Sequence, residues 1–201
     1  MEASVNKYEV RIFGSNPYEH TVPYDLLTQV LTELAEERTL DIQERFENNE
    51  YKRNSIAFAL LDPTAPFWKL SDETLLAIVG IGPERENYKV NALAKAITHR
   101  DYNIDCGILA HTQKHRLPDG AFNWGYSVNL NGTIVGASGL AETQDRHQAI
   151  LFATSFNNKI VDLRKAWEEA HPDNNWLCNF NKPLPRYTNI LKQNPRVLLK
   201  G

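Results

Sequence analysis

The chain has few cysteines, no excess of charge of one sign and no internal repeat. Its two cysteines, Cys106 and Cys178, exclude a disulfide framework and a four-cysteine zinc site, and they are typical of a reducing compartment. The 22 basic and 25 acidic residues give a formal net charge of -3 and are mixed along the sequence. Because no strongly basic segment stands out, we expect neither nucleic acid nor a membrane as a partner.

Long apolar runs are also absent. No window approaches the roughly 18 apolar residues that a membrane span requires, and the first residues, MEASVNKYEVRIFG, lack the apolar segment of a signal peptide. These absences predict a soluble, cytoplasmic protein. A length of 201 residues fits one domain of ordinary size. We expect a single α+β domain over residues 1–170 and, over residues 171–201, an extended arm that packs on its own domain or on a neighbouring subunit.

Hydrophobic periodicity predicts a mixture of strands and helices. We expect strands at residues 8–13, 55–61, 75–80, 124–130 and 133–139, and helices at residues 23–46, 88–99 and 143–170. The first helix is either continuous or broken near Thr39, and Asn157-Asn158 is the expected weak point of the last one. Residues 105–120 show no clear period and end in a turn signal, so we expect a loop there.

The segment from Asn129 to Gln148 is the most informative part of the sequence. Asn131-Gly132 supplies two positions that accept positive φ, as a type I′ turn between two strands requires. Gly136 and Gly139 lack the Cβ that would keep another backbone or a ligand at a distance. Relief of crowding between strand and helix is the simpler explanation of these glycines. Gln144 and Asp145 then occupy the electropositive first turn of the last helix, which Thr143 or a neighbour would cap.

Residues 132–145, GTIVGASGLAETQD, resemble the GlcG/HbpS family, in which a Val-Gly-Ala-x-Gly-like strand end precedes a Gln-Asp or Glu-Asp pair that opens a helix. The order of elements, including a helix KVNALAKAI with Lys89 and Lys95, agrees over roughly residues 22–160. The chain departs from the family in the connection DPTAPFWKLSDE, which replaces the usual Asp-x-Gly-Gly, and in the arm from His171.

The resemblance implies a profilin-like sandwich, with a central antiparallel sheet of about five strands and helices packed on its faces, and it implies assembly into homo-oligomers. Members of the family are described as heme-binding or heme-degrading proteins, and a similar domain is attached to PduO-type corrinoid adenosyltransferases. We therefore expect a small-molecule ligand, such as heme or a related tetrapyrrole, near residues 111–122 and the start of the last helix.

Several residues are candidates for contact with that ligand. Neutral imidazole is a common iron ligand, so four histidines are candidate heme-iron ligands: His99, His111, His115 and His147. The spacing of His111 and His115 would place them on one helix face, although solvated loop histidines are the simpler explanation. The other residues expected at the ligand are Gly120, Phe122, Tyr126, Gly136, Gly139, Gln144 and Asp145.

Two other classes of function remain open. In an enzyme acting on a small polar substrate such as a hydroxyacid, Asp145 and His147 would serve as acid and base; a capping carboxylate beside an exposed histidine is the simpler explanation. In an oligomeric adaptor, the aromatic residues of the arm would anchor a partner: Trp176, Phe180 and Tyr187. No complete catalytic motif is present, so the sequence does not decide whether the protein is an enzyme.

Overall fold

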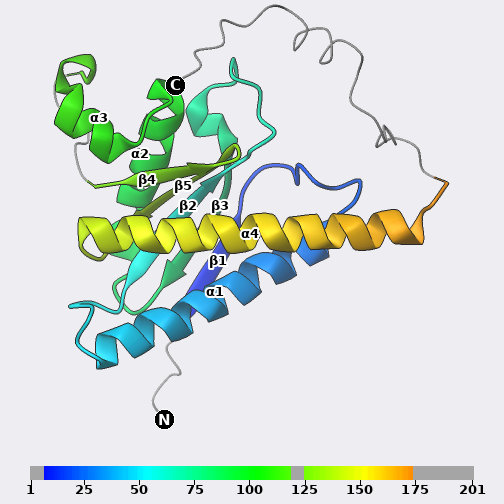
Figure 1. Ribbon diagram of the computed structural model, residues 1–201, viewed down its shortest axis with the longest axis horizontal. Helices are drawn as coiled ribbons and strands as arrows, with labels where there is room; N and C mark the ends of the chain where they lie inside the picture. The colour runs from blue at the N-terminus through cyan, green and yellow to red at the C-terminus, as the bar shows by residue number, and fades with distance from the viewer. Residues whose placement is uncertain (1–6, 119–124, 174–201) are drawn as a thin grey trace, which may run out of the picture. The chain divides into compact units, whose positions relative to one another are not determined.

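The computed structural model describes residues 7–118 and 125–173 and shows an α+β fold (Figure 1). Its five strands form one antiparallel sheet in the order β1-β3-β2-β5-β4. The strands are β1 (Tyr8–Ile12), β2 (Ile56–Leu61), β3 (Leu75–Ile81), β4 (Ser127–Leu130) and β5 (Thr133–Ser138), and the helices are α1 (Tyr24–Glu47), α2 (Glu86–Tyr102), α3 (Cys106–Thr112) and α4 (Glu142–Ala170). The predicted class, an antiparallel five-stranded sheet with helices on its faces, is confirmed.

The chain divides into one compact unit ending at Lys165 and a second unit beginning at Ala166. All five strands and the helices α1, α2 and α3 belong to the first unit. The predicted arm lies almost entirely outside the described residues, as do the candidate ligand residues Gly120 and Phe122. No helix in the described part of the chain is long and apolar enough to cross a bilayer.

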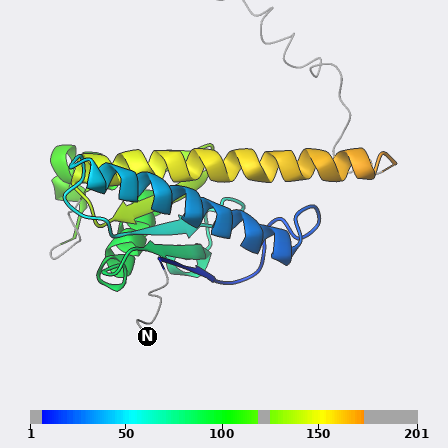
Figure 2. The same ribbon diagram turned by 90° about the horizontal axis from the view of Figure 1, so that it is seen from below.

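Helices α1 and α4 cover one face of the sheet (Figure 2). Alternate residues of β2 point into this layer, where the ring of Phe58 stacks on that of Phe152 at a centroid distance of 4.8 Å. The larger of the two clusters of buried apolar residues lies in this layer. Burying each phenylalanine side chain contributes about 1.5–3 kcal/mol. The alternative of a break near Thr39 is wrong: α1 is continuous, and the Thr39 hydroxyl donates to the Ala35 carbonyl within the helix at 2.6 Å.

Helix α2 covers the opposite face through small side chains. The buried residues on both sides of this layer include Ala57 and Ala59 of β2 and Ala92 and Ala96 of α2. A Cβ on Gly136 would lie 2.1 Å from the carbonyl oxygen of Ala92, so the two backbones are in direct contact. The close approach predicted from this glycine is therefore made by the protein's own helix.

Gly139 has the same kind of explanation. Its φ is +143°, and a Cβ there would lie 2.3 Å from the backbone oxygen of Ser55, where the chain enters β2. Crowding within the protein thus accounts for both glycines, and the space beside each is filled by backbone.

The β4–β5 hairpin has the predicted turn. Asn131 and Gly132 both have positive φ, 54° and 90°, and Asn129 Oδ1 accepts a hydrogen bond from the Gly132 amide at 2.9 Å. Asn157 is not a weak point, because α4 continues through it. Its side-chain amide donates to the Leu130 carbonyl at 3.1 Å, so it ties the hairpin to the helix.

The expectation of a loop over residues 105–120 is wrong for its first half. Residues Cys106–Thr112 form α3, and the Asp105 carboxylate caps this helix by accepting from the amides of Gly107 and Ile108. A short 3-10 turn, Lys114–Arg116, follows. The helix is too short to show the apolar period from which helices are predicted. In the sequence, only the capping residue Asp105 indicates where it begins.

Candidate functional site

A buried ion pair joins α2 to the start of α4. Lys95 Nζ donates to Asp145 Oδ2 at 2.9 Å and to the carbonyl oxygen of Ala137, in β5, at 2.6 Å. The two side chains are 2% and 5% exposed. Lys95 reaches β5 because Gly136 lets the backbone of α2 approach that strand. Removing two charges from water costs several kcal/mol per ion unless each is paired and hydrogen-bonded, as both are here.

Asp145 also organises the start of its own helix. Its second carboxylate oxygen accepts from the Leu140 amide at 2.9 Å, while Gln144 Oε1 accepts from the Ala141 amide at 3.1 Å. These side chains satisfy backbone donors that the first turn leaves unpaired. Burial raises the pKa of Asp145, and Lys95 and the Leu140 amide oppose that rise.

His99 lies one helical turn beyond Lys95 on the same face of α2. Its Nδ1 is 2.8 Å from Ser127 Oγ in β4, and that oxygen also accepts from the Cys106 amide at 3.1 Å. Burial lowers the pKa of His99, with a smaller opposing effect of Asp105. The ring is therefore neutral at pH 7. Among the hydrogen bonds of residues 7–118 and 125–173, none involves His99 Nε2.

The thiol of Cys106 completes this group. Its Sγ donates to the Gly125 carbonyl at 3.0 Å, and burial raises the pKa of the thiol to about 11. A protonated, buried thiol is a poor nucleophile, so the structure assigns it no covalent chemistry. We call this set of buried side chains the Lys95 cluster: Lys95, His99, Cys106, Ser127 and Asp145.

Gly125 borders the Lys95 cluster. Its φ is +64°, and a Cβ there would lie 2.6 Å from Lys95 Nζ, so any larger residue would press on the ammonium. The neighbouring Tyr126 packs against Gly107 of α3, and the guanidinium of Arg146 lies 5.1 Å from the centre of its ring. Tyr126, a predicted ligand residue, is thus held by α3 and α4 next to the cluster.

The remaining candidate histidines are separated. His111 lies in the last turn of α3 and His115 in the 3-10 turn that follows, so they do not share a helix face, and both are exposed. His147 is exposed on α4, and residues two apart on a helix point in different directions, so it does not face Asp145. In the described part of the chain, no group of three or more His, Cys, Asp or Glu side chains is suited to hold a metal ion.

The sequence indicates His99 and Asp145 as candidates, but it gives no role to Lys95, Ser127 or Cys106. A signal for Lys95 was present, since it falls between Ala92 and Ala96 on the apolar stripe of α2. A lysine in such a stripe needs a buried partner. That the partner is Asp145, fifty positions away, follows only from the fold.

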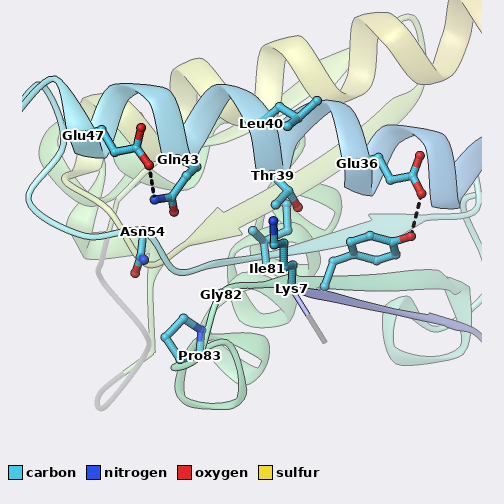
Figure 3. Close-up of a pocket in the computed structure, with 11 residues that line it drawn as sticks. Lys7, Glu36, Thr39, Leu40, Gln43, Glu47, Asn54, Ile81, Gly82 and Pro83 are labelled. Carbon is cyan, nitrogen blue, oxygen red and sulfur yellow. Dashed lines mark hydrogen bonds between the residues drawn. The ribbon is translucent and has the colours of Figure 1, made fainter. Parts of the chain in front are cut away.

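A groove of about 690 Å³ lies between α1 and the β1–β3 edge of the sheet (Figure 3). Two hydrogen bonds fix its walls: Tyr8 Oη donates to Glu36 at 2.8 Å, and Gln43 donates to Glu47 at 2.7 Å. The groove is lined by Lys7, Tyr8, Glu36, Thr39, Leu40, Gln43, Glu47, Asn54, Ile81, Gly82 and Pro83. None of the candidate residues predicted from the sequence is in this set.

In comparisons with known proteins, no family model matches the chain, and no curated protein or solved structure is significantly similar to it.

Proposed function

We propose that this protein is a small-ligand-binding domain whose ligand contacts the Lys95 cluster. The observation that supports this is the buried Lys95–Asp145 pair with a neutral, oriented histidine one helical turn away. Buried ion pairs are poor stabilisers, because apolar residues of similar volume often serve folding equally well. Clusters of buried titratable groups are typical of binding and catalytic sites.

Two groups of the cluster have capacity for a ligand. The ammonium of Lys95 has three N–H donors, and two acceptors occupy it within the described residues, the Ala137 carbonyl and Asp145. The third donor suits a carboxylate or carbonyl oxygen. At His99, an Nδ1 proton directed at Ser127 Oγ leaves the Nε2 lone pair for a metal.

We propose heme or a related tetrapyrrole as the ligand, in keeping with the resemblance to the GlcG/HbpS family. The donor set fits this class, since an oriented neutral imidazole suits the iron and an ammonium suits the carboxylates of the macrocycle. When bound, heme would supply a redox-active iron. His99 is 6% exposed, so neighbouring side chains must move before a ligand reaches it, and association should be slower than diffusion allows.

A hemin titration followed by absorption spectroscopy tests the proposal. We expect a saturable Soret shift in the unmodified protein that is lost in His99→Ala and partly restored in that variant by added imidazole. The matched controls are His111→Ala, His115→Ala and His147→Ala, which replace exposed histidines and should keep the shift. No shift in the unmodified protein contradicts tetrapyrrole binding, and a full shift in His99→Ala contradicts the assignment of the iron ligand.

An enzyme acting on a small polar substrate such as a hydroxyacid is the second candidate. The observation that favours it is the same ion pair, because a buried ammonium beside a carboxylate is suited to proton transfer. In this enzyme, Lys95 and Asp145 would take the acid and base roles that the sequence suggested for Asp145 and His147. Isothermal titration with glycolate and lactate tests this candidate: saturable binding that is absent in Lys95→Met supports it, and no heat of binding from either acid contradicts it.

Assembly into homo-oligomers through the arm stays a prediction, because the arm's aromatic residues lie outside the described residues. Truncation after Ala170, followed by sedimentation velocity, tests it. A smaller particle that keeps its circular dichroism spectrum would support an oligomer clamp, whereas an unchanged particle size would contradict one.

A further inference from the structure

The connection between β2 and β3 exposes an unusual concentration of large apolar side chains. Phe67, Trp68 and Leu70 are 90%, 73% and 66% exposed. The rings of Phe67 and Trp68 meet edge to face at a centroid distance of 5.0 Å, a favourable arrangement for an aromatic pair. Contiguous exposed apolar surface of this kind marks binding sites in soluble proteins.

This connection is held in place by α2. Arg100 Nη2 donates to the backbone oxygens of Pro66 at 2.7 Å and Lys69 at 3.2 Å, and the Ser71 hydroxyl donates to the Asp101 carboxylate. The bonded residues Pro66 and Lys69 flank the aromatic pair in the sequence. The rings are therefore presented on a fixed backbone, which lowers the entropy lost on binding.

The aromatic pair borders a groove of about 680 Å³, which lies within the size range of small-molecule sites, about 300–1,000 Å³. The connection forms one wall, the end of α2 another and the β4–β5 turn a third. Its charged lining residues balance, with Asp62 and Asp101 against Lys69 and Arg100. Asn103 adds an amide at the end of α2.

This composition selects among ligand classes. The cores of protein interfaces are depleted of charged side chains, whereas this groove contains four. A phosphate group would need a surplus of uncommitted cationic donors. Arg100 is bonded to backbone oxygens, and the single ammonium of Lys69 is offset by the two carboxylates that line the same groove. The groove is suited to a neutral ligand that carries many hydroxyl groups and has an apolar face.

We propose that this groove binds a neutral oligosaccharide. The C–H groups on one face of a pyranose ring would pack on the exposed ring of Trp68, with Phe67 beside it. Sugar hydroxyls, which both donate and accept, would bond Asp101 and the Asn103 amide. This site is separate from the Lys95 cluster and does not depend on the ligand proposed there.

Isothermal titration calorimetry with four probes tests the site: maltohexaose, cellohexaose, chitohexaose and xylohexaose. We expect saturable binding of at least one of them, weakened about tenfold by Trp68→Ala, a change that corresponds to about 1.4 kcal/mol and lies within the range for an aromatic contact. Tyr24→Ala is the matched control, because it removes an exposed ring from α1 that does not line this groove. It should leave the affinity unchanged. A heparin hexasaccharide should bind at least tenfold more weakly than the best neutral probe.

Three results would overturn the proposal. The first is no saturable binding of any of the four neutral probes. The second is binding that survives both Phe67→Ala and Trp68→Ala, with folding confirmed by circular dichroism. The third is tighter binding of the heparin hexasaccharide. If the unmodified protein binds no sugar and its sedimentation coefficient is larger than that of these two variants, the surface would be assigned instead to contact with a second copy of this chain.

Discussion

The two faces of the sheet are covered in different ways. Helices α1 and α4 bury large aliphatic and aromatic side chains, such as Leu31 and Phe152, whereas α2 meets the sheet through alanines and the Cβ-free surface of Gly136. The close approach of the α2 and β5 backbones leaves little room for large apolar side chains between them. It brings Lys95 within hydrogen-bonding distance of a β5 carbonyl. The α1–α4 face therefore stabilises the fold, and the α2 face fixes the positions of polar groups.

The largest effect should come from Asp145→Ala. This change leaves Lys95 buried without its carboxylate and removes the acceptor of the Leu140 amide. Breaking one side of a buried pair costs about 3–5 kcal/mol, which a urea unfolding titration would measure. In the double variant Lys95→Met/Asp145→Leu most of that loss should be regained, because no buried charge remains. A double variant as unstable as the single one would show that the pair is needed for folding.

Gly136→Ala should destabilise the α2 face by about 3 kcal/mol, at the upper end for overpacking. The added methyl group would meet the Ala92 backbone, which cannot rotate away as a side chain can. Thermal and urea unfolding measure the effect. The matched control is Gly14→Ala, where φ is +67° but the nearest atom to a Cβ lies 4.0 Å away, so only backbone strain of about 1 kcal/mol is expected. Equal losses in both variants would contradict close packing at Gly136.

On the opposite face, Gln148→Ala should cost about 2 kcal/mol. Gln148 is fully buried and donates to Asp41 at 2.6 Å and to Tyr51 Oη at 3.0 Å, and its loss leaves these acceptors with one partner fewer. The control is Gln43→Ala, which removes an exposed bond to Glu47 and should cost less than about 0.5 kcal/mol. A negligible effect of Gln148→Ala would mean that apolar packing alone holds α1 against α4.

The smallest expected effect is the pH dependence contributed by His99. Its pKa is lowered in the folded state, so below its ordinary value of about 6.5 the unfolded chain binds a proton that the folded protein does not. Stability should fall as the pH drops from 7 to 5, and His99→Gln should flatten that fall. Urea midpoints at several pH values measure it, with His111→Gln as the control. An unchanged slope in His99→Gln would contradict a neutral, buried ring.

Local patterns were sufficient for most of the fold. Alternation, short apolar runs and helical periods predicted the five strands and the three long helices of the described residues to within a few residues, because those patterns directly reflect which side faces a core. Residues Cys106–Thr112 were missed since seven residues are too few to show a helical period. For the candidate site, Asp145 and His99 were recognisable as titratable residues, but their partners were not.

The sequence by itself determined the features that neighbouring residues produce. The Asn131-Gly132 turn, the apolar stripes of α1 and α4, and the capping carboxylate of Asp145 all depend on interactions over a few positions.

Only the tertiary structure decided what lies against each element. It places Lys95 beside Asp145, His99 beside Ser127, and the backbone of α2 against Gly136. These contacts join residues dozens of positions apart. They form only when the sheet and its two helical layers are assembled. A charge is unstable in the interior unless it is paired, and burial depends on the whole fold and not on local conformational preference.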